Sequence, residues 1–105
     1  MRAIINVAPF YRHPSYARNY EKNCYHDYIC ECCGKPLNSD SMKQIQMLES
    51  GHWTDETREV KAIYNEKGEW AGHSQGFWYI GPDCYKHIME IVRKAGESKT
   101  IEVEL

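Results

Sequence analysis

Strands are predicted wherever apolar and polar residues alternate along the chain. Because successive side chains of a strand point to opposite faces, a period of two indicates a half-buried strand. The stretches with this pattern are residues 2–7, 43–49 and 58–64. The apolar run at residues 77–80 predicts a buried strand, and Asn65 to Gly68 have the composition of a hairpin turn that leads to a return strand at Trp70. Residues 51–56 are expected to form a turn or loop.

Apolar residues at intervals of three and four predict two helices. The first follows Ser15, a candidate N-cap, and covers Tyr16–Cys24. The second begins at Pro82, in a Gly-Pro-Asp sequence that ends the preceding strand, and it ends at Gly96, a candidate C-cap. Residues 100–105 then predict a C-terminal edge strand. These elements predict an α+β fold, in which an antiparallel sheet of about four strands carries the C-terminal helix.

Length and composition are those of one small soluble domain. The 105 residues are 42% hydrophobic and 27% charged, and eight Tyr, three Trp and two Phe are too many aromatic residues for a disordered chain. A core of this size is only marginally stable, so that a bound metal would strengthen it. No apolar run approaches the roughly 20 residues of a membrane span. The N-terminus lacks a small-residue cleavage site, so a signal peptide is not expected.

Charge and cysteine content narrow the choice of function. The net charge is −2, with five Lys/Arg against three Asp/Glu in residues 1–36 and eight against twelve in residues 37–105. The strongly basic surface typical of nucleic-acid binders is therefore missing overall, although the N-terminal third keeps a mild basic excess. The five cysteines are an odd number, which argues against a complete disulfide framework and favours a reducing compartment such as the cytoplasm.

Two short motifs predict one zinc site. Cys30-x-x-Cys33 has the spacing of a zinc knuckle, in which Gly34 lets the backbone fold back beneath two thiolates. Cys84 and His87 share a face at the start of the second helix, where the helix dipole favours a thiolate. Three thiolates and one imidazole are a common ligand set for a structural Zn²⁺ ion. Such an ion would join the turn to the helix across about fifty residues.

Other interpretations of the cysteines remain open. They can be core residues of a reduced protein, or a redox pair, although the βαβ context of such a pair is missing. Cys32 lies between the two proposed knuckle ligands and would replace Cys30 if the turn were formed differently. Cys24 and His26 form a further candidate metal pair that could include Cys32, but a surface histidine and a half-buried cysteine explain them as well.

The cysteine motifs resemble those of a known group of proteins. The run CxxCGKPL and the sequence Ile-Gly-Pro-Asp-Cys-x-x-His are similar to those of small treble-clef-like zinc proteins of bacteriophages and prophages, most of which have no assigned function. The resemblance covers residues 28–37 and 76–93, about a quarter of the chain, and Cys32 departs from its simple CxxC pair. It implies a phage or mobile-element origin and a location in the cytoplasm of a bacterium or phage-infected cell. The ligands that it implies are Cys30, Cys33, Cys84 and His87.

The whole chain, residues 1–105, is predicted to form a single zinc-stabilised domain. Its parts are an N-terminal segment at 1–27, a zinc-binding core at 28–95 and the C-terminal edge strand at 96–105. The N-terminal segment carries basic and aromatic side chains that can hold phosphates and stack on bases, namely Arg12, Tyr16, Arg18 and Tyr20. The same mixture can cover a core with amphipathic side chains, so this segment has two interpretations.

Three functions are compatible with these features. The first is a non-enzymatic interaction protein with one structural zinc and a protein partner; no small-molecule substrate is evident. The second is a nucleic-acid binder that uses the N-terminal segment. The third is a metal-dependent nuclease that uses His52 or His73, and it is the weakest because a zinc with four protein ligands has no open position for water. Among the three tryptophans, Trp53 lies beside loop residues and is expected to be the most exposed.

Overall fold

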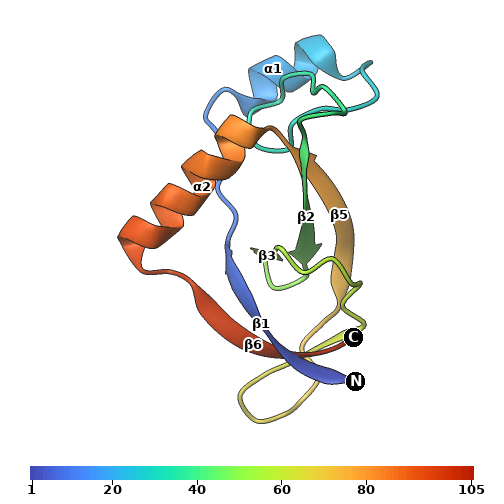
Figure 1. Cartoon of the computed structure of the whole chain (residues 1–105), viewed down its shortest axis with the longest axis vertical. Helices are drawn as coiled ribbons and strands as arrows, with labels where there is room; N and C mark the ends of the chain where they lie inside the picture. The colour runs from blue at the N-terminus through green and yellow to red at the C-terminus, as the bar shows by residue number, and fades with distance from the viewer.

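The computed structural model describes residues 1–105, which form six antiparallel strands and two helices (Figure 1). The elements in chain order are β1 (Arg2–Pro9), α1 (Tyr16–Asn23), β2 (Lys43–Leu48), β3 (His52–Thr54), β4 (Ala62–Tyr64), β5 (Ser74–Ile80), α2 (Pro82–Ala95) and β6 (Lys99–Glu104). The strands form one curled sheet in the order β4-β6-β1-β3-β2-β5. The predicted α+β class is therefore confirmed, with six strands instead of about four.

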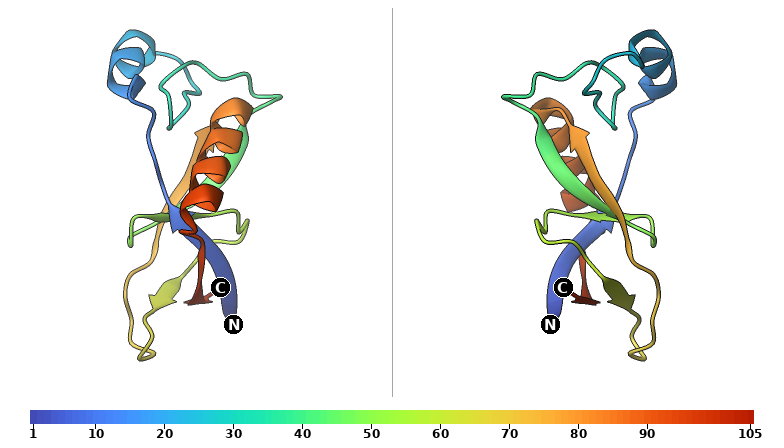
Figure 2. Two further views of the ribbon diagram at one scale, coloured as in Figure 1. Left: turned by 90° about the vertical axis from the view of Figure 1, so that its left-hand side faces the viewer. Right: turned by 90° about the vertical axis from the view of Figure 1, so that its right-hand side faces the viewer.

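Strand β1 connects the two halves of the sheet. It pairs with β6 over Arg2–Val7, but with β3 only at Ala8 and Pro9. Beyond β3, β2 pairs with β5 over Lys43–Leu48. The molecule is elongated, with extents of 44 × 29 × 23 Å, and its two termini lie together at the end opposite α1 (Figures 1 and 2). Neither helix combines the length and apolar composition that crossing a membrane requires.

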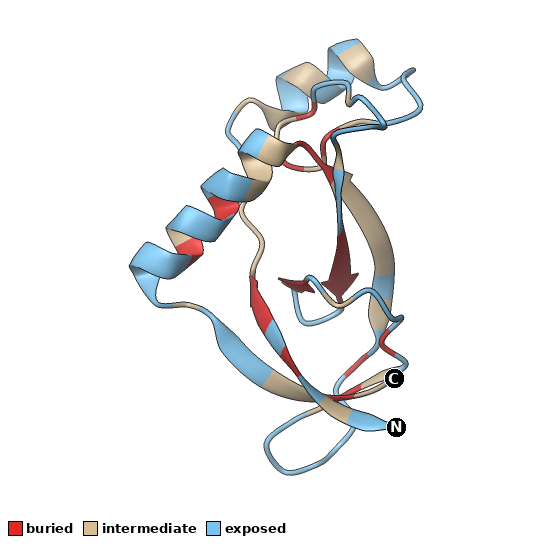
Figure 3. Ribbon diagram, viewed as in Figure 1, coloured by how far each residue is buried: buried red, intermediate tan, exposed pale blue.

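Two hydrophobic clusters fill the interior, one in each half (Figure 3). The first joins α2 to β2, β3 and β5, and its buried members are Ala8, Cys30, Cys32, Ile45, Met47, Trp53, Ile80, Ile88 and Val92. The second lies along β1, β4 and β6, and its buried members are Ile5, Val7, Leu48, Val60, Ile63 and Val103. Since Cys30, one of the predicted zinc ligands, belongs to the first cluster, the predicted zinc site is continuous with the core that holds α2.

Helix α2 begins and ends where the sequence predicts. Pro82 lies in its first turn, where a missing N–H removes no helical bond, and Asp83 places a negative charge near the positive end of the helix dipole. Gly96 ends the helix with a φ of 64°, and its N–H is donated to carbonyl oxygens of the last turn. Ile88 and Val92 are buried, so one face of the helix packs against the sheet.

The prediction for residues 51–56 was wrong, because β3 lies within them. The indole N–H of Trp53 donates a hydrogen bond to the Pro9 carbonyl oxygen at 3.1 Å. Trp53 is accordingly only 3% exposed, whereas Trp70 is 64% exposed, which reverses the expected order. Trp70 forms an isolated bridge with Tyr64 instead of opening a return strand.

The C-terminal strand is also not an edge strand. β6 lies between β4 and β1, so both of its sides are paired along part of its length. The strand predicted at residues 58–64 is shortened to β4, because residues 56–60 bond instead to the side chain of Gln46. The edges of the sheet are β4 and β5.

Candidate metal centre

Three thiols from two distant parts of the chain converge at one point. The Sγ atoms of Cys30, Cys33 and Cys84 all lie within 4.8 Å of one another. Cys30 is buried, and the other two cysteines are half-buried. All three are unpaired thiols. The structure therefore brings together three of the four ligands that the sequence predicts, and these three could hold a metal ion.

Backbone hydrogen bonds form the turn that carries the first two thiols. The N–H of Gly34 donates to the carbonyl oxygen of Cys30 at 2.8 Å, and the N–H of Cys30 donates to that of Lys35 at 2.9 Å. A further bridge between Ile29 and Pro36 closes the base of the turn. Gly34 has a φ of 78°, a conformation that residues with a Cβ atom rarely adopt. The turn is thus specified by its glycine at the position that the knuckle motif predicts.

Helix α1 packs directly against this turn. A Cβ atom on Gly34 would lie 2.6 Å from the Tyr16 carbonyl oxygen and 2.8 Å from the Tyr20 backbone nitrogen. The Asn19 side chain also donates a hydrogen bond to the Cys33 carbonyl oxygen at 2.8 Å. The N-terminal segment is therefore part of the structure that holds the cysteine turn in place.

The sulfur of Cys30 accepts backbone hydrogen bonds from both parts of the site. The N–H of Gly81 points at it from 3.3 Å and that of Cys33 from 3.5 Å. Burial opposes ionisation of Cys30, but N–H groups of Gly81, Cys33 and Cys32 outweigh it and hold the pKa of this thiol below its ordinary value. The site thus contains built-in partners for a thiolate.

Cys84 lies in the first turn of α2, three residues after Gly81. Burial and the negative charge at Cys30 raise the pKa of the Cys84 thiol. A second thiolate this close to Cys30 would need a counter-charge, which a divalent cation would supply. The local chemistry therefore agrees with a cation-binding role for the three sulfurs.

The geometry fits a zinc ion. Tetrahedral ligands at a Zn–S distance of about 2.3 Å lie about 3.8 Å apart, so the observed spread of up to 4.8 Å needs a contraction of about 1 Å at most. Sulfur donors favour a soft metal ion over magnesium or calcium. The residues present are thus suitable zinc ligands.

His87, the fourth predicted ligand, is not part of this group. Its side chain belongs to an exposed residue of α2. Cys24 and His26 are exposed as well, and the ring of His26 stacks on Tyr25 with centroids 4.4 Å apart. Cys32, in contrast, is only 1% exposed and lies in the same core cluster as Cys30.

The two histidines considered for nuclease chemistry have separate partners. His52 Nδ1 lies 3.1 Å from Ser50 Oγ, and His73 Nε2 pairs with Glu49 Oε1 at 2.7 Å. The only group of three or more candidate metal ligands in the chain is the set of three thiols. The structure therefore does not bring these histidines into a metal-binding group.

The basic and aromatic residues of the N-terminal segment contact one another. The guanidinium of Arg12 lies 4.0 Å from the centroid of the Tyr16 ring, and it pairs with Glu31 at 3.3 Å. Tyr16 and Tyr20 stack with centroids 5.7 Å apart. Arg18 is exposed on α1. Arg12 is thus attached to the cysteine turn through Glu31, which offsets its charge.

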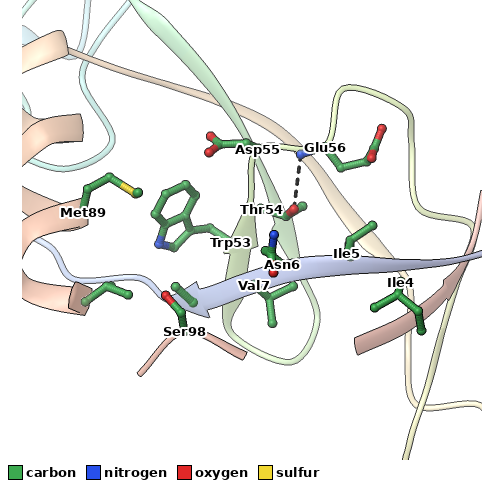
Figure 4. Close-up of a pocket in the computed structure, with 12 residues that line it drawn as sticks. Ile4, Ile5, Asn6, Val7, Trp53, Thr54, Asp55, Glu56, Met89 and Ser98 are labelled. Carbon is green, nitrogen blue, oxygen red and sulfur yellow. Dashed lines mark hydrogen bonds between the residues drawn. The ribbon is translucent and has the colours of Figure 1, made fainter. Parts of the chain in front are cut away.

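A groove of about 380 Å³ lies beside β1 and contains none of the thiols (Figure 4). The residues that line it are Ile4, Ile5, Asn6, Val7, Ala8, Trp53, Thr54, Asp55, Glu56, Met89, Val92 and Ser98. Tyr85 of α2 donates a hydrogen bond to Asp55 at 2.8 Å and so connects the helix to the rim of the groove. Burial and the Asp55 carboxylate raise the pKa of Tyr85 to about 12. Sequence patterns did not predict this groove, because it forms where β1 and β3 separate.

No protein-family model, curated protein or solved structure matches this chain. The resemblance to phage-encoded zinc proteins consequently stays a prediction.

Proposed function

We propose that the chain is a small, non-enzymatic interaction protein stabilised by one structural zinc ion. The observation that carries the zinc proposal is the convergence of Cys30, Cys33 and Cys84. These ligands belong to a turn and a helix separated by about fifty residues, so a bound ion would close a long loop. The order of cysteine turn, β2–β5 ladder and α2 supports a treble-clef-like arrangement.

Zinc content and chelation test the structural role. The purified protein is expected to contain one zinc per chain and to lose stability when a strong chelator removes it. Cys84→Ser should have a similar effect, because it removes the ligand that connects α2 to the turn. Cys24→Ser is the matched control, since Cys24 is exposed and lies outside the thiol group. Equal losses in the two variants would contradict the proposal.

The interaction role is supported by an open strand edge in the groove. In an antiparallel pair, every second residue directs its N–H and C=O groups toward the partner strand. The N–H of Leu105 donates to the Met1 carbonyl oxygen at 2.8 Å, so the odd-numbered residues of β1 are the ones that direct these groups toward β6. Ile4 and Asn6 therefore direct theirs to the opposite side. Strand β3 reaches β1 only at Ala8 and Pro9, and no loop residue bonds to the backbone of Ile4 or Asn6. Their N–H and C=O groups open onto the groove.

An extended peptide segment is the partner that this edge fits. Such a segment would add to β1 through backbone hydrogen bonds and place alternate side chains in the groove. Met89, which is 41% exposed, offers an apolar contact at one end, beside the buried side chains of Trp53 and Val92. Asp55 makes the other wall acidic, whereas Arg58, 2.9 Å away, offsets the charge of Glu56. The preferred segment would therefore combine apolar residues with Lys or Arg.

Amide hydrogen exchange provides the test without any substitution. Peptides would be selected from a random displayed library on the zinc-loaded protein. In the free protein, the amides of Ile4 and Asn6 should exchange faster than those of Ile5 and Val7, which bond to β6. A bound peptide should slow exchange at Ile4 and Asn6 while leaving Ile5 and Val7 unchanged. Unchanged exchange at Ile4 and Asn6 in the complex would contradict docking at this edge.

Nucleic-acid binding by the N-terminal segment is the second candidate function. The stacked rings of Tyr16 and Tyr20 on α1 favour it, because aromatic side chains can stack on bases. The pairing of Arg12 with Glu31 weakens it, because part of the positive charge is offset. This function predicts an affinity for single-stranded DNA or RNA that falls steeply with salt and drops further in Arg18→Ala. Binding that does not depend on salt would exclude it.

A further inference from the structure

We propose that Cys32 is the fourth zinc ligand, in place of His87. This inference rests on the proposed structural zinc and names the complete ligand set, Cys30, Cys32, Cys33 and Cys84. Three sulfurs leave one position of a tetrahedral zinc open. Among the residues predicted from the sequence, Cys32 and His87 are the two that neighbour the thiol group along the chain. The structure separates them by burial and by packing, because Cys32 lies in the core cluster of Cys30 and His87 is exposed.

Cys32 lies in the buried hydrophobic cluster that the three converging thiols belong to or pack against. It is 1% exposed and packs in the same buried cluster as Cys30, with Cys33 and Cys84 at its border. Cys32 is therefore packed beside the three converging thiols without belonging to their group.

The backbone on both sides of the Cys32 side chain is held in place. The carbonyl oxygen of Cys32 accepts the N–H of His13 at 2.9 Å, and that of Cys33 accepts the Asn19 side chain at 2.8 Å. The Cys32 thiol lies 3.6 Å from the Tyr11 carbonyl oxygen, a weak interaction for sulfur. To bind the metal, the Cys32 side chain would turn away from Tyr11 and toward the three converging sulfurs.

His87 has the opposite surroundings. Neither residue belongs to the group of three converging thiols, but His87 is an exposed residue of α2 and Cys32 is buried. Although it lies three residues after Cys84, His87 is exposed, whereas Ile88 beside it is buried. His87 would have to leave solvent to reach the metal, whereas Cys32 is already desolvated.

Four thiolates and one Zn²⁺ carry a net charge of −2, and this charge needs compensation. The N–H groups of Gly81 and Cys33 already point at the Cys30 sulfur, and the N-terminus of α2 directs its positive dipole end at the site. On binding, each thiol that is protonated gives up its proton to solvent, and its sulfur lone pair forms the bond to zinc. No electron transfer is involved.

X-ray absorption of the zinc-loaded full-length protein counts the ligands directly. The expected result is four sulfurs at about 2.3 Å, whereas a set with His87 would give three sulfurs and one nitrogen at about 2.0–2.1 Å. Titration of the variants with zinc gives a second readout. Cys32→Ser should weaken zinc binding about 100-fold or more, while His87→Ala and the control Cys24→Ser should stay within about twofold of the wild type.

The possible results distinguish a failure of the Cys32 assignment from a failure of the proposed structural zinc. Cobalt loading adds a check on Cys32→Ser, because the sulfur-to-cobalt absorption band should fall by about a quarter when one of four thiolates is lost. Three sulfurs with one nitrogen, together with metal loss in His87→Ala, would overturn the Cys32 assignment and leave the structural zinc intact. Three sulfurs with one water oxygen, unaffected by either variant, would also overturn it. A wild-type protein without zinc would overturn the proposed function itself.

Discussion

Substitution of Gly34 by alanine tests the packing of α1 against the cysteine turn. Two terms contribute to its effect. Alanine at a φ of 78° is strained by about 1 kcal/mol. The added Cβ atom would also lie 2.6 Å from a backbone oxygen and 2.8 Å from a backbone nitrogen of α1. Because backbone atoms cannot rotate away as a flexible side chain can, we expect overpacking to cost a further 1–3 kcal/mol, roughly.

Gly68 provides the matched control for the strain term. Its φ is 77°, and a Cβ atom there would meet nothing within 4 Å. Gly68→Ala should therefore destabilise the protein by about 1 kcal/mol, and Gly34→Ala by about 2–4 kcal/mol. The difference of about 2 kcal/mol corresponds to roughly 10 °C in melting temperature for a domain of this size.

Thermal unfolding followed by circular dichroism, with the same excess of zinc in every sample, measures this difference. Equal melting temperatures for the two variants would refute the reasoning, because they would mean that α1 does not contact the turn as closely as the structure has it. A larger loss in Gly68→Ala than in Gly34→Ala would refute it as well.

Two further predictions concern the half of the protein away from the thiols. Gln46 is fully buried, and its side chain bonds to backbone groups of Glu56, Arg58 and Val60. In urea unfolding, Gln46→Leu should therefore lower the free energy of unfolding by about 3 kcal/mol. The control Gln44→Leu, at an exposed position, should lower it by less than about 0.5 kcal/mol. Burial and the nearby Lys99 hold the pKa of His52 below its ordinary value of about 6.5. Because the folded state favours neutral His52, this contribution to stability is present above about pH 6.5 and is lost as the pH falls below it. His52→Gln should therefore lose less stability than the wild type between about pH 7.5 and 5.5, and identical slopes would contradict the assignment.

Local sequence patterns predicted the elements that a few neighbouring residues specify. Helix α2 has a proline at its start, a glycine at its end and a continuous apolar face, so its limits could be predicted from the sequence. The cysteine turn could be predicted equally well, because the spacing of Cys30, Cys33 and Gly34 specifies both its thiols and its backbone conformation.

Features that depend on distant residues were not predictable in this way. Trp53 looks like a loop residue because its burial comes from Pro9 and α2, which lie far away in the sequence. The position of β6 between β1 and β4 depends on pairing between the two ends of the chain. The apolar pattern of one strand does not indicate which other strands it pairs with. For the same reason, residue spacing favoured His87 over Cys32, although burial favours Cys32.

Native mass spectrometry of the freshly purified protein tests the central claim most directly, when it is combined with a melting curve before and after chelation. We predict one zinc ion per chain. Its removal should lower the melting temperature by about 15 °C or more, because closing a loop of about fifty residues is worth about 4 kcal/mol by chain entropy alone. A metal-free protein with five free thiols that melts at the same temperature with and without chelator would contradict the account, and the four cysteines of the turn and α2 would then be ordinary core residues.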